Sequence, residues 1–562
     1  MGNSDNQIAP HFVNQYILTD VFLNAKDNGN LRRPLLPSIS TLISGSFLVI
    51  ILVVARAILL IILSRLPGSR KVVEKISVAN TGVVYHDGRA LATCESGPPM
   101  RIQLPGLETI GWYNGIAAGN EPYGGGRGGF GGKGPAAFMK EWTTGHPRVD
   151  PITEEFISIH AVFVKPYVFY SVVPASGRAG SVGRVRRQPM FDVPIPGIRS
   201  PKMMHDFGVA SHHTVILDLP LSLDPMRCIS GKPIISFDST ERSRFGVFPR
   251  YRPHQVQWFE TNPCVIFHTA NCWETASVGL AMETCVHLVV CRLTSASVLY
   301  SAGALSLPIP EAVPPEYAEE EQCRLYYYSF PLAADGPDQQ PMIRDQWALS
   351  AIPFEFPSVS SRHAMSSARF IYGCSMGSTS SYSPGLGKAA KIDYLAKLDI
   401  RTLIARGTAH PPRQIKGCVD RRTVDEIMQS QDVDDPIRLF PMPKGWYAQE
   451  PRFVSRHGAL SEDDGWLLTY VFDETQLDEE GECGEEAVSE LWVIDAKGMR
   501  DVVARIRLPQ RVPYGLHGAW FSEREIADQK MVEAVRRETT KAEVDASGPL
   551  SRIRDIIEKA IG

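Results

Sequence analysis

The sequence has no closely spaced pair of cysteines. Its 562 residues include 10 cysteines, yet no two of them stand in a C-x-x-C arrangement. A zinc ribbon, or the disulfide framework of a small secreted domain, would need paired cysteines at short and regular spacings. The N-terminal residues also lack the pattern of a secretory signal peptide. We therefore expect reduced thiols and a cytoplasmic protein.

The sequence also has no large excess of charge of either sign. Lysine and arginine together number 58, aspartate and glutamate 62, and the formal net charge is only −4. Nucleic-acid-binding proteins usually carry a basic excess or a concentrated basic patch, so we expect no nucleic-acid partner. With 44% hydrophobic and 21% charged residues, the chain has the composition of an ordinary globular protein.

One long apolar run is present, at residues 46–63, with the sequence SFLVIILVVARAILLIIL. It is about as long as a bilayer-spanning helix. Arg56 lies at its centre. Inserting an arginine at the centre of a membrane helix costs about 2.5–3.5 kcal/mol, which so apolar a helix can tolerate, so a single membrane span is possible. Arg65, Arg70 and Lys71 follow the run, as in helices anchored in the membrane interface. We favour peripheral or monotopic membrane association; a single span and a buried core helix are the alternatives.

After residue 75 the chain changes to short β-type runs. Examples are CVIFHTANCW, VHLVVCRL and WLLTYVFDE, and the runs are separated by Gly, Pro, Asp and Asn. This pattern predicts an all-β sandwich, barrel or propeller. Because no sharp boundary divides the region, we favour one β-propeller over residues 76–562, preceded by an N-terminal segment, residues 1–75, that carries the apolar helix. No WD or kelch repeat is present, so the prediction depends on strand spacing.

Four of the 14 histidines stand at the edges of β-type runs. They are His146 in GHPRVDP, His205 in KMMHDF, His268 in FHTANCWE and His517 in RVPYGLHGAWF. Their separations exclude a local helical site such as H-E-x-x-H. Taken singly, each is more often a structural histidine than a metal ligand. If they meet, they meet on a propeller axis, where the inner strands of different blades converge.

Together the four motifs resemble the metal-histidine motifs of the carotenoid cleavage oxygenase family (retinal pigment epithelial membrane protein-like), in the same order. The resemblance extends from about residue 79 to about residue 521. It implies a seven-bladed β-propeller with a non-haem Fe(II) ion on the axis, held by the four histidines, with open positions for O₂. Asp206, next to the second histidine, is expected to be a structural group at a strand end rather than a base.

The resemblance also implies three glutamates that accept the ring N–H groups of the metal ligands and so fix their orientation. The matching residues are Glu95 in ATCESGPP, Glu355 in PFEFPSV and Glu450 in QEPRFVS. The pairing of these glutamates with the histidines stays open at this point. No catalytic residue beyond the metal site is expected.

The chain departs from the family pattern in two respects. Family motifs of the form G-x-x-x-R-x-G-P-N-P and D-G-D-G-M are not found, so we expect an incomplete first blade. The stilbene-cleaving branch places a lysine directly before the first glutamate to bind a phenolic hydroxyl, and Cys94 occupies that position here. Loss of this cation argues against hydroxystilbene substrates.

The expected function is that of a non-haem Fe(II) dioxygenase. Such an enzyme adds both atoms of O₂ across one C=C bond of a carotenoid or apocarotenoid and gives aldehyde or ketone products. The segments GRALATCESGPP and FVNQYILTDVFLNA look closest to the fungal torulene- and β-carotene-cleaving branch. A membrane surface is a further expected partner, because the polyene is dissolved in the bilayer. The alternatives are stilbene cleavage and an inactive propeller that binds carotenoids.

Overall fold

A computed structural model describes most of the chain. The described residues are 10–27, 35, 39–44, 47–65, 72–122, 128–132, 140–176, 187–276, 284–302, 323–332, 341–377, 391–515 and 517–538. The N-terminal helices are α1 (Asp20–Asp27), α2 (Ile39–Ser44) and α3 (Phe47–Ser64). Later in the chain come α4 (Ser297–Ala302), α5 (Ile400–Ala409), α6 (Val424–Met428) and α7 (Glu523–Ala527), and the 3-10 turns η2 (Pro225–Ser230), η3 (Pro253–Gln255) and η4 (Glu474–Gln476).

The first three large sheets have four strands each. The first comprises β1 (Gly82–His86), β2 (Arg89–Thr93), β3 (Met100–Gln103) and β4 (Glu108–Trp112). The second comprises β5 (Arg148–Val149), β6 (Phe156–Ala161), β7 (Val168–Val173) and β8 (Met190–Pro194). The third comprises β9 (Gly208–Val209), β10 (His213–Asp218), β13 (Ser243–Pro249) and β14 (Gln257–Thr261), with a separate ribbon of β11 (Leu221–Leu223) and β12 (Ile235–Phe237).

Three more sheets follow. The fourth comprises β15 (Val265–Ala276), β16 (Thr284–Leu293), β17 (Cys323–Pro331), β18 (Asp345–Ser350) and β22 (Cys418–Asp420). The fifth comprises β19 (Glu355–Ser358), β20 (Phe370–Ser375), β21 (Tyr394–Asp399) and β23 (Ile437–Pro441). The sixth comprises β24 (Trp446–Ala448), β25 (Arg452–Ser455), β26 (Gly465–Asp473), β27 (Glu490–Asp495) and β28 (Val502–Arg507). Neighbouring strands are antiparallel except for the parallel pair β18 and β22.

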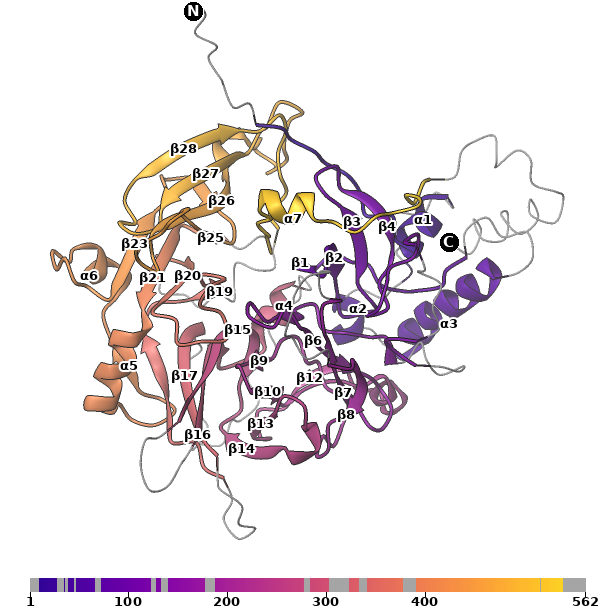
Figure 1. Ribbon diagram of the computed structural model, residues 1–562, viewed down its shortest axis with the longest axis horizontal. Helices are drawn as coiled ribbons and strands as arrows, with labels where there is room; N and C mark the ends of the chain where they lie inside the picture. Colours follow the sequence, from indigo (N-terminus) through magenta and orange to yellow (C-terminus); the bar gives the residue numbers. More distant parts are fainter. Residues whose placement is uncertain are drawn as a thin grey trace, which may run out of the picture.

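The six sheets follow one another around a ring, with β1, β9, β15 and β19 near its centre (Figure 1). The all-β propeller prediction is therefore confirmed, but the count of seven blades was wrong, since the described part of the chain forms six. Helix α7 lies in the arc between the sixth sheet and the first (Figure 1). Residues 508–515 and 517–522, which precede α7, form no strand. Pro509 and Pro513 lie there, and proline cannot donate to a β-ladder.

Close packing of the blades explains why many strands are apolar on both faces. In β16, for example, eight of the ten residues are buried, in contrast to the alternation of a strand with one wet face. The largest core cluster extends over the third to sixth sheets and includes the fully buried Trp347 and Trp492. Inner strands in such a frame are held firmly at the axis.

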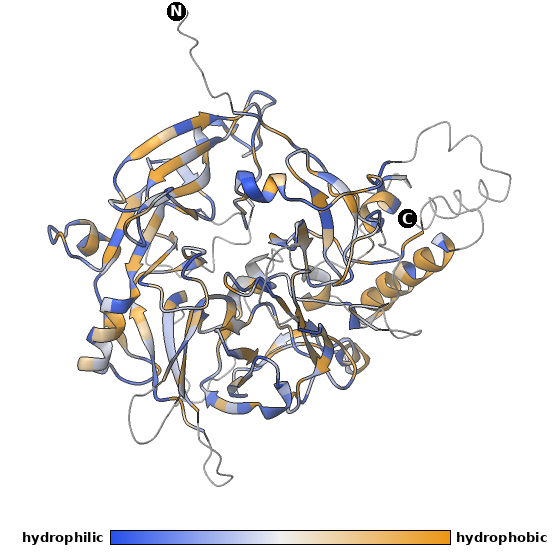
Figure 2. Ribbon diagram, viewed as in Figure 1, coloured by the Kyte–Doolittle hydropathy of each residue, from blue (hydrophilic) through white to orange (hydrophobic). Residues whose placement is uncertain are grey.

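Helix α3 presents an apolar face to the outside of the propeller. On its inner side, Leu60 is buried against Val21 and Val73, and Arg56 is half-buried. Four of its outward side chains are exposed by half or more: Leu48 70%, Leu52 68%, Ile58 53% and Ile62 54%. Figure 2 shows the helix coloured as hydrophobic along most of its length. Residue 46, Arg70 and Lys71 lie outside the described residues.

The length and apolarity needed for a membrane crossing are not met by any helix in the described part of the chain. The apolar run forms helix α3 on the surface of the propeller, attached by the side that carries Leu60. It is not a fully buried core helix, because Leu48 and Leu52 are 70% and 68% exposed.

The C-terminal segment after α7 is attached to the first sheet. Gln529 Nε2 donates to the carbonyl oxygen of Leu104 at 2.7 Å. The backbone N–H of Lys530 donates to the carbonyl oxygen of Gly88 at 2.9 Å. Further along, the backbone N–H of Arg536 donates to the carbonyl oxygen of Thr109 at 2.7 Å. These hydrogen bonds therefore hold residues 529–536 against the first blade.

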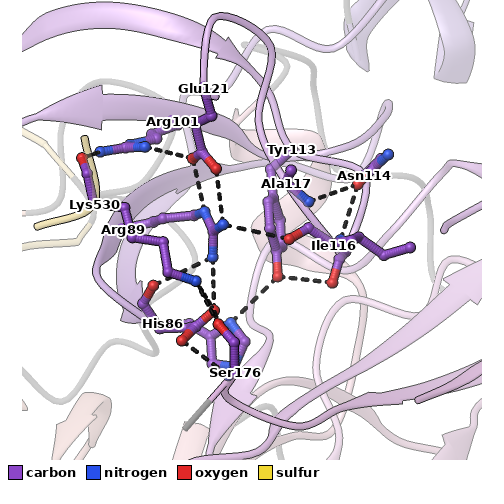
Figure 3. Close-up of polar contacts among 12 residues, drawn as sticks. His86, Arg89, Arg101, Tyr113, Asn114, Ile116, Ala117, Glu121, Ser176 and Lys530 are labelled. Carbon is purple, nitrogen blue, oxygen red and sulfur yellow. Dashed lines mark hydrogen bonds and ion pairs between the residues drawn. The ribbon is translucent and has the colours of Figure 1, made fainter. Parts of the chain in front are cut away.

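A buried set of charges reinforces this attachment. Figure 3 shows Arg89 and Arg101 converging on Glu121, with Lys530 beside them. Arg89 donates to the two carboxylate oxygens of Glu121 at 2.7 and 2.8 Å, and Lys530 Nζ pairs with Asp87. Buried charges are tolerated only when they are paired in this way. The cluster links the segment that follows His517 to strands β2 and β3.

Candidate metal centre

The structure brings the four predicted histidines together. His146 stands just before β5, His205 just before β9, His268 within β15, and His517 in the extended segment between β28 and α7. One ring nitrogen of each lies within 4.8 Å of those of the other three. Nε2 of His146 lies 2.9 Å from Nε2 of His205, and Nε2 of His268 lies 3.2 Å from Nε2 of His517. The four imidazoles could therefore share one metal ion.

Local irregularity in β15 contributes to this convergence. The register between β15 and β16 shifts between Ile266 and Thr269, and again between Thr269 and Asn271. Such bulges re-aim side chains and are common next to functional sites. His268 lies inside the first shift, so its ring direction is set by the bulge.

Each of the three predicted glutamates pairs with a different histidine. Nδ1 of His205 lies 2.6 Å from Oε1 of Glu95. Nδ1 of His268 lies 2.6 Å from Oε2 of Glu355, and Nδ1 of His517 lies 3.2 Å from Oε1 of Glu450. These contacts answer the pairing question that the sequence leaves open.

The glutamate contacts direct the histidine lone pairs. A carboxylate that accepts from Nδ1–H places the ring proton there and leaves the lone pair on Nε2. Two of the carboxylates are held in turn by the backbone, because Glu355 accepts from the N–H of Phe356 at 2.6 Å and Glu450 from the N–H of Gly518 at 2.7 Å. The Nε2 atoms that approach one another are thus the free acceptors a metal requires.

Burial and charge act on the protonation of the cluster. Burial, and then the neighbouring imidazoles and Arg148, lower the pKa of His146 well below its usual range. Burial also lowers the pKa of His517, although Glu450 opposes the shift. Burial acts in the same direction on His268, but the carboxylate of Glu355 outweighs it and raises the pKa. At His146 and His517 a metal ion would therefore displace no proton at neutral pH.

The donor set fits a first-row transition metal. Imidazole nitrogen suits Fe, Cu, Ni and Zn, whereas Mg²⁺ and Ca²⁺ prefer oxygen ligands. Four neutral imidazoles would leave a divalent ion its full charge. The hydrogen-bonded glutamates supply the outer support that metal-ligating histidines usually have.

A cavity of about 470 Å³ adjoins the cluster. His146, His268 and His517 form part of its wall. Apolar side chains from several blades form other parts: Val83, Val209, Val359, Phe453 and Phe521. A volume of this size lies in the range of small-molecule sites. The cavity can therefore place an apolar ligand beside the imidazoles of His146, His268 and His517.

Cys94 does not reach this cavity. Its side chain is buried, with 1% of its surface exposed, and its Sγ lies 3.0 Å from the Ser77 hydroxyl and 3.2 Å from that of Ser96. The position before Glu95 thus offers no cation for a phenolate.

Sequence reasoning singled out Asp206 but missed its partners, Arg148 and Thr269. Arg148 Nη2 donates to both Asp206 oxygens, at 2.8 and 2.6 Å, and the N–H of Thr269 donates to Asp206 Oδ2 at 2.7 Å. Asp206 is therefore a structural group, as expected. A signal existed, because all three residues stand within two positions of a predicted ligand.

Comparison with known proteins gives a consistent picture. Residues 5–522 match the family model described as retinal pigment epithelial membrane protein. The carotenoid dioxygenase carX of Gibberella fujikuroi is 48% identical to this chain. The alignment covers 99% of this chain and 86% of the carX chain. Carotenoid 9,10(9′,10′)-cleavage dioxygenase 1 of Phaseolus vulgaris is 29% identical over 80% of this chain and 67% of its own.

A solved structure supports the fold. The lignostilbene dioxygenase of Pseudomonas brassicacearum matches with a TM-score of 0.58, over 90% of this chain and 83% of its own. The sequence identity is 19%, so this likeness concerns the fold alone.

Proposed function

We propose that the four-histidine cluster of this chain, which belongs to the retinal pigment epithelial membrane protein family and is a carotenoid cleavage dioxygenase, holds the Fe(II) ion at which a C=C bond of a carotenoid or apocarotenoid is cleaved. The observation that carries the proposal is the convergence of four imidazoles, three of them paired with glutamates, beside a cavity whose wall is partly apolar. Iron bound there would supply the activation of O₂. Its ligands would be His146, His205, His268 and His517.

The glutamates keep the site ready for the metal. Glu355 and Glu450 accept from Nδ1 of His268 and His517, and Glu95 Oε1 lies 2.6 Å from Nδ1 of His205, so each partner histidine presents its Nε2 lone pair without rotating. Rigid ligands of this kind avoid reorganisation when the metal binds. The three carboxylates act on the ligands and do not touch the substrate in this proposal.

The cavity orients the polyene and limits the access of water. The apolar side chains in its wall, such as Val83, Val359 and Phe453, would contact a conjugated hydrocarbon chain. Fixing one double bond next to the metal site converts a bimolecular encounter into a positioned reaction, which is the main contribution a protein makes to cofactor chemistry.

A carotenoid substrate is favoured over a stilbene for two reasons. The relative that is 48% identical over nearly the whole chain is named as a carotenoid dioxygenase. In this chain the side chain of Cys94 replaces the phenol-binding lysine and is buried away from the cavity.

The outward face of α3 is proposed to lie in a membrane interface, where the polyene is dissolved. The exposed side chains of Leu48, Leu52 and Ile58 form a continuous apolar surface on one helix. Helix α3 also contacts η2, which exposes Met226 by 66% and Ile229 by 65%. Apolar patches of this extent on a protein surface mark interaction sites, and lipid is the partner that suits an uncharged helix face.

Product analysis tests the proposed reaction. The Fe(II)-loaded full chain would be incubated with a panel of carotenoids and apocarotenoids in detergent, and the products identified by mass. We expect two carbonyl products that account for one cleaved double bond, and no product from His268→Ala. If the chain bound carotenoid without consuming oxygen, it would be a carotenoid-binding protein and not an enzyme. If it cleaved hydroxystilbenes alone, it would be a stilbene-cleaving dioxygenase.

A further inference from the structure

A buried carboxylate connects the segments that carry three of the four histidines. Asp206 is 1% exposed. Its oxygens accept from Arg148 Nη2 at 2.6 and 2.8 Å, from the N–H of Thr269 at 2.7 Å and from the N–H of Phe207 at 2.7 Å. A carboxylate this deeply buried is stable only with such a full set of donors.

Arg148 contacts Thr269 as well as Asp206. Its Nη2 also lies 2.5 Å from the hydroxyl oxygen and 3.0 Å from the carbonyl oxygen of Thr269, so its two N–H groups are shared between Thr269 and the carboxylate of Asp206. The Thr269 hydroxyl lies 3.0 Å from Asp206 Oδ2, so the three side chains form a closed triangle. A planar guanidinium is well suited to bridge two acceptor groups in this way.

Each residue of the triangle lies next to, or two residues from, a different histidine of the cluster. Arg148 is two residues after His146, Asp206 directly follows His205, and Thr269 directly follows His268. The three residues come from three different blades. Because β5 and β9 have only two residues each, backbone ladders alone hold these segments weakly. The fourth histidine lies outside the triangle and is held instead through Glu450.

We propose that Arg148, Asp206 and Thr269 are positioning residues for the metal centre, which set the mutual distances of His146, His205 and His268. This inference depends on the proposed metal site. The triangle acts on ligand geometry across blades, whereas each glutamate orients a single ring. Loss of one member would loosen three ligands at once and leave the fourth in place.

Cobalt substitution tests this role without an activity assay. Co(II) would be bound to the wild-type chain and to the variants Asp206→Asn, Thr269→Val and Thr269→Ser. Its visible absorption reports ligand geometry, and competition with a chelator reports affinity. We expect Asp206→Asn and Thr269→Val to weaken Co(II) binding about 10- to 100-fold and to change the absorption bands. Thr269→Ser keeps the hydroxyl and should restore both.

A matched control separates positioning from general stability. Asp218 is a buried aspartate that accepts from Arg244 Nε at 2.9 Å, on β10 and β13 of the third blade. Asp218→Asn should lower the melting temperature but leave Co(II) affinity and absorption unchanged. Wild-type binding and bands in both Asp206→Asn and Thr269→Val would overturn the positioning role, as would equal changes in Asp218→Asn. If the wild-type chain bound no Co(II) or Fe(II), the proposed function itself would fail.

Discussion

Removal of the carboxylate of Asp87 should loosen the attachment of the segment after α7, which contains Lys530, to the first blade. Asp87 pairs with Lys530, accepts from Ser176 Oγ at 2.5 Å and accepts from Arg89 Nη1 at 2.8 Å. Burial alone would raise its pKa. The hydrogen bonds from Lys530 and Ser176 and the charges of Lys530 and Arg89 outweigh burial and lower the pKa from 3.8 to about 2.

The shift sets the size of the effect. A change from 3.8 to about 2 corresponds to about 2.4 kcal/mol, at about 1.36 kcal/mol per pKa unit. Asp87 is 14% exposed, but Lys530 is 34% exposed, and burial lowers the pKa of Lys530, so both solvent screening and desolvation reduce the net gain. We expect Asp87→Asn to lower the free energy of unfolding by about 1–2 kcal/mol at pH 7.

The pH dependence has a definite sign. Because the folded-state pKa of Asp87 is depressed, its contribution is fully present above pH about 4 and is lost as the pH falls through about 2. The difference between wild type and Asp87→Asn should therefore be constant from pH 7 to about pH 5 and shrink below about pH 4.

Urea unfolding at a series of pH values measures this difference, and trypsin cleavage at Arg524, which is 77% exposed, reports release of the C-terminal segment. Glu538→Gln is the control, because its ion pair with Lys26 is exposed, at 41% and 45%, and belongs to the same segment. Equal stability of Asp87→Asn and wild type at pH 7 would refute the reasoning. So would an equal loss in Glu538→Gln, or a difference that stays constant down to pH 3.

Three further predictions concern the metal site and the membrane. Replacing any one of the four histidines with alanine should abolish cleavage and sharply reduce the iron retained after gel filtration; unchanged iron in all four variants would contradict the ligand assignment. Glu450→Gln keeps a carbonyl acceptor but loses the charge that supports His517, so metal affinity measured by chelator competition should fall about 10- to 100-fold; wild-type affinity would remove Glu450 from the site. Leu52→Glu on α3 should reduce co-sedimentation with liposomes, whereas Leu460→Glu, at an exposed position in the sixth blade region, should not.

The sequence singles out the four histidines that the structure brings together, because each lies in a short local motif; their role as metal ligands stays a prediction. It cannot pair them with the glutamates, since the partners are far apart in the chain: 87 residues separate His268 from Glu355 and 67 separate Glu450 from His517. Only the folding of the blades around a common axis brings them together. The same reason hides the triangle around Asp206, whose members come from three blades.

The number of blades is the part of the fold that the sequence left wrong. Strand-like runs recur along residues 76–562 without a repeat motif, so nothing in the pattern counts the sheets. The arc after β28 is filled by an extended segment and α7, not by a further sheet. The helix in the apolar run was predicted correctly, because length and composition are enough to indicate it. Its attachment through Leu60 could not be predicted, because it depends on contacts with α1 and Val73.

The measurement that tests the central claim most directly is product labelling under ¹⁸O₂. Iron-loaded protein would be given a carotenoid it cleaves, and the carbonyl products would be reduced to alcohols at once, before their oxygen exchanges with water. A dioxygenase at the four-histidine centre predicts one heavy oxygen atom in each product and none from His205→Ala. Label in only one product, or full cleavage by His205→Ala, would contradict it.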